Sequence, residues 1–164
     1  AMEVDDLEMG DGETVRWATD FLSREHEKPF FLAVGLFQPH LPFYAPKKYF
    51  DQLPLDQVEV PINLPGDLDD IPPGGQKMAA SRREDLRMIE EYDNLQHTVQ
   101  SYLASIAHAD TLVGILMGAF DNSVYRDNTV VSRLPSACGT ETRAYEFVNL
   151  FHVVVDKRSV GSTE

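Results

Sequence analysis

The spacing of hydrophobic residues changes along the first forty positions, and the first spacing is that of a helix. Val15, Ala18 and Leu22 recur every three or four residues, which places them on one face of an α-helix. Glu13 lies where the first turn would begin, and a negative charge is favourable there because it faces the positive end of the helix dipole. We therefore predict an amphipathic helix over Glu13–Glu25.

A second spacing follows, in which apolar residues stand almost without interruption from Phe30 to Phe37. Such short runs are typical of strands buried on both faces of a parallel sheet. Thr129, Val130 and Val131 begin another run of strand-forming residues. Helix followed by buried strand predicts an α/β fold, with both strands in one sheet and the helical region between them over one face.

Residues 83–120 have helical spacing, with a break near Asp93–Asn94. Beyond the break we predict one apolar stripe, made of Val99, Leu103, Ile106, Val113, Met117 and Phe120. Asp110 falls within this stripe, and a buried carboxylate is costly unless it is paired. We expect Asp110 to pair with a cation or with backbone donors of a neighbouring element, a catalytic role being the alternative. His97 and His108 lie off the stripe and are expected at the surface.

Five further segments complete the pattern. Ala1–Glu13 carries six acidic residues and no basic one, so we expect a solvated lead-in without fixed structure. Gly66–Gly75 combines turn formers with three carboxylates and is expected to be a surface loop. It lacks the glycine at the sixth position and the glutamate at the twelfth position of a calcium-binding EF-hand loop. Lys47–Leu53 is expected to form one or two helical turns, Val58–Pro61 a short edge strand and Glu146–Val155 a strand.

Three prolines follow the strand that ends at Phe37, in the sequence Gln-Pro-His-Leu-Pro-Phe-Tyr-Ala-Pro of residues 38–46. Proline has no amide donor, so the chain must leave the sheet there. In open α/β sheets ligands bind beyond the carboxyl ends of the strands. His40 is therefore a candidate site residue; the alternative is a loop histidine that bonds only to nearby backbone.

Composition narrows the function classes. The 164 residues include 14 lysine and arginine residues against 27 aspartate and glutamate residues, a formal net charge of −13. A nucleic acid would be repelled by this charge, so we expect no nucleic-acid partner. No apolar run approaches the roughly 18 residues of a membrane span, and the acidic N-terminus does not read as a signal peptide. We therefore expect no membrane partner, and nothing in the chain as written that exports it.

The last part of the chain differs from the rest. From Arg133 onward basic and acidic residues are equal in number, and Pro135 stands where a central strand would still need an amide donor. Cys138 is the only cysteine, so no intrachain disulfide and no cysteine-based zinc cage is available. These changes predict a boundary near Val131.

Longer motifs connect the chain to a known family. Residues 28–35 read Lys-Pro-Phe-Phe-Leu-Ala-Val-Gly, residues 38–43 read Gln-Pro-His-Leu-Pro-Phe, and residues 45–50 read Ala-Pro-Lys-Lys-Tyr-Phe. Residues 100–107 read Gln-Ser-Tyr-Leu-Ala-Ser-Ile-Ala. In these motifs the chain resembles bacterial sulfatases of the iduronate-2-sulfatase-like group, over roughly Asp5 to Val131.

The resemblance implies an α/β, alkaline-phosphatase-like (sulfatase) fold, of which this chain would be an incomplete part. For the intact family member it also implies calcium and a formylglycine made from a cysteine, which supply a metal and a nucleophile for hydrolysis. The nucleophile motif and an aspartate pair would precede Ala1, and the chain after Val131 does not continue into the family's Ser-Asp-His-Gly or Ser-Asp-Asn-Gly. We therefore expect no cofactor and no metal ligand in this chain. Only His40 carries over, matching the family's Pro-His in the loop that reaches the sulfate group.

The resulting hypothesis has residues 1–131 as an internal part of a sulfatase catalytic domain and residues 132–164 as a tail outside the family, explained by a frame change or a faulty gene model. The intact protein would hydrolyse sulfate monoesters of sulfated sugars or small molecules, and this chain would be inactive. Two alternatives stay open: a non-catalytic interaction module of the same fold, and a related phosphonate or phosphodiester hydrolase. The family is often periplasmic, extracellular or lysosomal, and the sequence does not choose among these.

Overall fold

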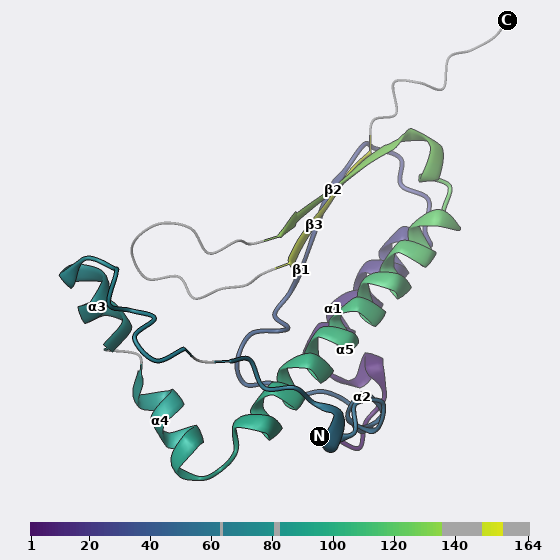
Figure 1. Ribbon diagram of the computed structural model, residues 1–164. Helices are drawn as coiled ribbons and strands as arrows, with labels where there is room; N and C mark the ends of the chain where they lie inside the picture. Colours follow the sequence, from purple (N-terminus) through teal and green to yellow (C-terminus); the bar gives the residue numbers. More distant parts are fainter. Residues whose placement is uncertain (63, 81–82, 136–148, 156–164) are drawn as a thin grey trace, which may run out of the picture.

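The computed structural model describes residues 1–62, 64–80, 83–135 and 149–155. In this part of the chain two long helices, α1 (Gly10–Leu22) and α5 (Leu95–Asp121), lie side by side over one face of a small sheet (Figure 1). The sheet contains β1 (Phe31–Leu36), β2 (Thr129–Pro135) and β3 (Asn149–Val155). The predicted mixture of helices and strands is confirmed.

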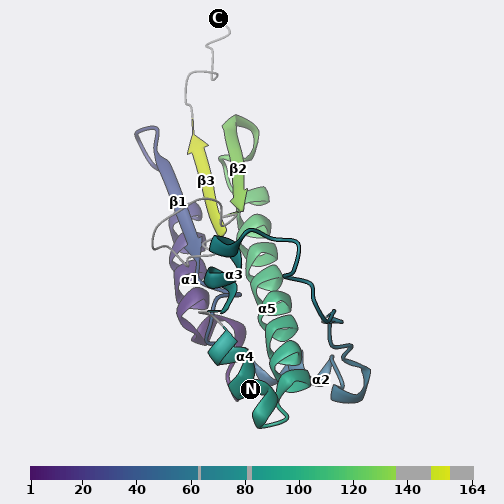
Figure 2. The ribbon, with the colours of Figure 1, turned by 60° about the vertical axis from the view of Figure 1, so that its left-hand side comes forward.

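The strand order is β1-β3-β2, and β3 runs antiparallel to both neighbours (Figure 2). The prediction that β1 and β2 share one sheet is confirmed, and the two strands are parallel to each other. They do not pair directly, because β3 from the predicted tail lies between them. β2 is therefore an edge strand, which explains how the sheet tolerates Pro135 at its end.

Burial alternates along β1, so the prediction of a strand buried on both faces is wrong. Leu32, Val34 and Leu36 are buried against the helices, whereas Phe31 is 60% exposed on the opposite face. The physical reason is that, among the described residues, helices cover only one face of the sheet. An uninterrupted apolar run does not report whether a second layer is present.

The core lies between α1, α5 and the covered face of the sheet. Val15, Ala18 and Leu22 of α1 are essentially inaccessible to solvent, as the predicted helix requires. They pack with the β1 side chains and with Leu112, Leu116 and Phe120 of α5. Tyr125 closes one end of this core: its hydroxyl donates to Arg24 O at 2.7 Å and accepts the amide proton of His26 at 2.7 Å.

Of the predicted stripe on α5, Phe120 is buried and Val113 and Met117 pack, partly buried, against the core, whereas the prediction is wrong at Leu103 and Ile106. Asp110 is exposed, as are Leu103 and Ile106, whereas His108 is completely buried. The residues on the buried side are Ala104, Ser105, His108, Ala109, Leu112, Leu116 and Phe120. Because Asp110 faces solvent, it needs no buried partner. By length and composition α5 could also cross a membrane, a possibility that a search for unbroken apolar runs misses; here it packs against α1 as a core helix.

The N-terminal segment has a definite structure, so the prediction of an unstructured lead-in is wrong. Asp6–Glu8 forms the 3-10 turn η1, and Met2 pairs with Pro46. η1 lies so close to α1 that a Cβ at Gly12 would come within 2.1 Å of Asp6 O. This contact tolerates only glycine.

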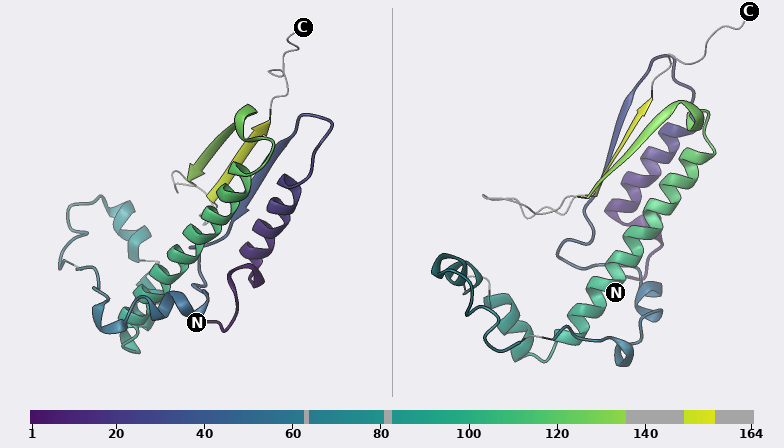
Figure 3. Two further views of the ribbon diagram at one scale, coloured as in Figure 1. Left: turned by 90° about the vertical axis from the view of Figure 1, so that its right-hand side faces the viewer. Right: turned by 45° about the horizontal axis from the view of Figure 1, so that its top comes forward.

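The remaining elements link these parts. They are α2 (Lys47–Asp51), η2 (Leu55–Gln57), α3 (Pro73–Ala80), α4 (Arg83–Glu91) and η3 (Arg126–Asn128). Asp93, at a φ of 53°, marks the predicted break between α4 and α5. The prediction of a strand over Val58–Pro61 is wrong, and the loop predicted over Gly66–Gly75 gives way to α3 at Pro73. Figure 3 shows α3 and α4 projecting from the N-terminal end of α5.

Candidate functional site

His40 lies in the proline-rich loop that leaves the carboxyl end of β1, as predicted. The loop contains two cis peptide bonds, Gln38–Pro39 and Leu41–Pro42. His40 is half-buried, its amide donates to Phe37 O at 3.0 Å, and its ring packs 4.8 Å from the Phe37 ring. The imidazole is thus held by its own loop at the end of the strand.

The hydrogen bonding of the His40 ring decides which nitrogen can meet a ligand. Nδ1 lies 2.7 Å from Leu41 O. A carbonyl oxygen only accepts, so we assign the proton of the neutral ring to Nδ1. Nε2 then carries a lone pair and becomes a donor only when the ring is doubly protonated. A hydrogen bond from His40 to an anionic oxygen therefore requires the imidazolium.

A hollow of about 300 Å³ lies between the start of α1 and the His40 loop. It is lined by Met9, Gly10 and Asp11 from the helix and by Phe37, Gln38, Pro42 and Tyr44 from the loop. Its wall is mostly apolar and aromatic, with the Asp11 carboxylate and the Gln38 amide as polar groups. The hollow adjoins the loop that carries His40.

A second polar cluster surrounds the Asp6 carboxylate. Lys48 Nζ lies 2.6 Å from Asp6 Oδ2, and the Tyr49 hydroxyl donates to Asp6 Oδ1 at 2.8 Å. His108 Nε2 lies 3.2 Å from the backbone oxygen of Asp6. The buried His108 Nδ1 has no hydrogen-bond partner among the described residues. Asp6 thus joins η1 to α2 through its carboxylate and to α5 through its backbone carbonyl.

Burial and these contacts shift the pKa of each member of the cluster. Burial would raise the pKa of Asp6, but the hydrogen bonds from Lys48 and Tyr49 outweigh it and leave this pKa lowered. Burial lowers the pKa of His108 and raises the pKa of Tyr49. The hydrogen bond to Asp6 raises the pKa of Lys48. At neutral pH the cluster is a carboxylate and an ammonium group above a neutral imidazole.

Sequence reasoning missed this cluster. His108 follows Ala104 and precedes Leu112 and Leu116 at intervals of four residues, the spacing of one helix face, and this signal could have placed it in the core. The position of Asp6 had no such signal, since its partners Lys48 and Tyr49 lie more than forty residues away.

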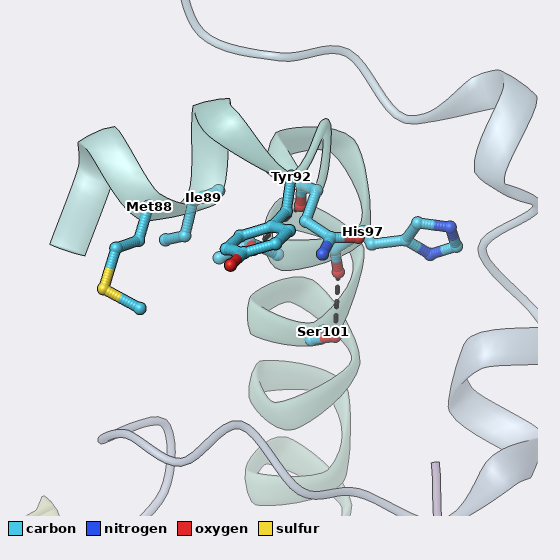
Figure 4. Close-up of a pocket in the computed structure, with 7 residues that line it drawn as sticks. Met88, Ile89, Tyr92, His97 and Ser101 are labelled. Carbon is cyan, nitrogen blue, oxygen red and sulfur yellow. Dashed lines mark hydrogen bonds between the residues drawn. The ribbon is translucent and has the colours of Figure 1, made fainter.

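Another hollow, of about 280 Å³, lies at the junction of α4 and α5 (Figure 4). Met88, Ile89 and Tyr92 supply its apolar side. The Ser101 hydroxyl donates to His97 O at 2.8 Å, and the His97 ring points away from Met88 and Tyr92. No acid, base and nucleophile converge there, so we assign it no chemistry.

Metal chemistry finds no support in the described residues. Within them, no three side chains of histidine, cysteine, aspartate or glutamate gather closely enough to hold a metal ion. Asp67, Asp69 and Asp70 are exposed on the loop before α3. Cys138 lies outside the described residues. The calcium that the family implies therefore has no fitting ligand set here, and the expectation that this chain supplies none stays a prediction.

Comparison with known proteins decides the family. A sequence model of the sulfatase family matches residues 6–134, from η1 through most of β2. The chain belongs to the sulfatase family. No solved structure matches it.

Three individual sulfatases are also similar to this chain in sequence. The chain is 34% identical over 132 residues to a sulfatase of Formosa agariphila, 30% over 118 residues to human iduronate 2-sulfatase, and 29% over 120 residues to an arylsulfatase of Clostridium perfringens. These matches cover 77%, 63% and 71% of this chain but only 25%, 20% and 24% of the relatives. The chain thus corresponds to about a quarter or less of the length of these relatives.

Proposed function

We propose that this chain is an internal part of a sulfatase catalytic domain that hydrolyses sulfate monoesters, and that His40 contacts the sulfate group. The observation that carries the proposal is the position of His40: it follows the carboxyl end of β1, inside the segment that matches the family. The mixed layer of helices and strands agrees with an alkaline-phosphatase-like fold, which we propose for the whole domain.

His40 can contribute in one of two ways. As an imidazolium it donates a hydrogen bond from Nε2 to a sulfate oxygen, or it gives that proton to the leaving oxygen. Proton transfer by a well-placed side chain contributes roughly 10²–10⁴-fold to a rate. Calcium and formylglycine, which family membership implies for the whole protein, would supply a charged metal and a nucleophile when present. The described residues offer no calcium site, so we assign them no step through it.

The test replaces the histidine equivalent to His40 in a full-length relative, such as the Formosa agariphila sulfatase. Replacement by glutamine should lower kcat on an aryl sulfate by roughly 10²–10⁴-fold, the usual contribution of general acid catalysis. Replacement of the surface residue equivalent to His97 is the matched control and should leave kcat within about twofold of the parent. Equal turnover by both variants would remove His40 from the site.

A non-catalytic interaction module remains the second candidate, because two large apolar side chains are exposed on the sheet face away from the helices. Phe31 and Val130 are 60% and 70% exposed there. The coding sequence upstream of Ala1 separates the two candidates. An encoded aspartate pair and Cys-x-Pro/Ala-Ser/Thr-x-Arg motif supports the enzyme, and a complete reading frame without them supports the module.

We further propose that residues 1–131 belong to the family domain and that residues 132–164 are a tail outside it. The equal charge balance of the tail and its departure from the family's Ser-Asp-x-Gly continuation support this. β3 lies in the tail and still pairs with both other strands. Reading the coding DNA in its other two frames tests the frame change: without a Ser-Asp-x-Gly continuation after Val131 in either frame, the explanation is wrong.

A further inference from the structure

Asp11 joins the start of α1 to the end of β1. Its Oδ1 accepts the amide proton of Phe37 at 2.9 Å, and its Oδ2 accepts that of Gln38 at 2.8 Å. Both carboxylate oxygens are thus engaged by two consecutive amides that lie 26 and 27 residues away in sequence. Charge-assisted hydrogen bonds are about twice as strong as neutral ones. This pair fixes where the loop begins.

The same loop is tied a second time by Gln38. Gln38 is 6% exposed as a residue, and its Nε2 donates to Tyr44 O at 2.5 Å. His40 lies between these ties, and its own amide donates to Phe37 O. The backbone on both sides of His40 is therefore held, and the first hold depends on Asp11.

Asp11 does more than favour the start of a helix. An acidic residue in the first turn stabilises a helix through the dipole without touching another element. Here both oxygens point to amides of the loop, and only a carboxylate offers two acceptors with no donor. An asparagine would accept one amide proton and turn its own amide protons toward the other.

We propose that Asp11 is a positioning residue for His40. By holding the amides of Phe37 and Gln38, it sets the loop conformation in which His40 Nδ1 bonds to Leu41 O and Nε2 is the nitrogen turned to a ligand. This inference rests on the proposed function for its purpose, since it is His40 that would meet the sulfate group.

The experiment compares the full 164-residue chain with Asp11→Ala, Asp11→Asn and the control Asp20→Asn, an exposed carboxylate on the same helix. NMR measures amide exchange at Phe37 and Gln38 and the nitrogen shifts of the His40 ring, assigned with His40→Gln. Asp11→Ala should speed exchange at both amides roughly 10-fold, as expected for the loss of charge-assisted hydrogen bonds. It should also reduce the Nδ1-protonated form of His40. Asp11→Asn should affect one amide more than the other, and Asp20→Asn neither.

Two outcomes overturn the inference: His40 ring shifts in Asp11→Ala equal to those of Asp20→Asn, or unchanged exchange at Phe37 and Gln38. Amide protection at Val15 and Leu22 shows whether α1 still forms. If Asp11→Ala loses it, Asp11→Asn decides by the same criteria. Titration with inorganic sulfate tests the proposed function separately. If the nitrogen shifts of the His40 ring in the parent chain do not change on addition of sulfate, the result counts against the proposed function. A change of these shifts in the Asp11 variants would still support the positioning role.

Discussion

The Tyr49 hydroxyl donates a 2.8 Å hydrogen bond to Asp6 Oδ1, and this bond ties α2 to the turn that precedes α1. Lys48 holds the other carboxylate oxygen, and the buried ring of His108 lies 5.4 Å from the Tyr49 ring. The N-terminal segment is therefore fixed by a side-chain cluster and by one backbone pairing at Met2.

Tyr49→Phe should lower the free energy of unfolding by about 1 kcal/mol, the usual net value of one hydrogen bond. Tyr92→Phe is the matched control, because Tyr92 is 68% exposed; it should change stability by less than about 0.5 kcal/mol. Urea unfolding followed by circular dichroism measures both. Equal effects of the two substitutions would show that the bond to Asp6 contributes nothing.

Acidification should destabilise the fold in two steps. The pKa of His108 is lowered by burial, so as pH falls below about 6.5 the unfolded chain takes up a proton before the folded chain does. The charges that act on this ring are those of Asp6, Asp11 and Lys48, and the Tyr49 ring lies 5.4 Å from it. The pKa of Asp6 is also lowered, so its contribution is present above about pH 3.9 and is lost below that value.

Urea midpoints measured from pH 8 to pH 3 test these two steps. His108→Gln should flatten the first decline, and Asp6→Asn should flatten the second. The control His97→Gln replaces an exposed histidine and should leave both declines of the urea midpoint unchanged. An unchanged first decline in His108→Gln would assign it to another group.

The buried face of α5 can be tested with two leucines. Leu112 is fully buried and Leu103 is 37% exposed. Leu112→Ala should lower the free energy of unfolding by about 2–5 kcal/mol, the range found for buried leucines, because it removes apolar contacts and leaves a cavity. Leu103→Ala should cost clearly less. Denaturant unfolding compares them, and the opposite order would restore the stripe expected from sequence.

The sheet face that no helix of the described residues covers should promote association. Phe31 and Val130 both pair with Val154 in the register of the sheet, so their positions form one row across it. Exposed apolar faces and unpaired strand edges favour contact between chains. Light scattering should show concentration-dependent association that Val130→Lys reduces and Ile62→Lys, at a loop position 87% exposed, does not. A monomer with a sharp melting transition would contradict the expectation.

The 164-residue chain itself should not hydrolyse an aryl sulfate above background, with or without calcium. A histidine alone does not replace the formylglycine nucleophile that the family implies, and it does not supply the six to eight oxygen ligands that calcium takes. Turnover assays and calcium titration calorimetry check the two halves of this prediction. Turnover that requires both calcium and His40 would reveal a nucleophile not recognised in the sequence.

Local sequence determined the elements whose causes are local. The spacing of Val15, Ala18 and Leu22 predicted α1 and its buried face. The apolar run from Phe30 to Phe37 predicted a strand, and the prolines after it predicted a loop that carries His40 beyond the strand end. In each case the neighbours in sequence impose the conformation, through helical periodicity or through the missing amide proton of proline.

Only the tertiary structure decided which surfaces meet. α5 is apolar on several sides, so its spacing could not choose between the stripe at Leu103 and Ile106 and the buried face at His108 and Leu112; the position of α1 made that choice. The partners of Asp6 and Asp11 lie 26 to 102 residues away, and β3 enters between β1 and β2 from far along the chain. Such contacts depend on how whole elements pack, because burial and hydrogen-bond pairing are settled between surfaces that local periodicity does not specify.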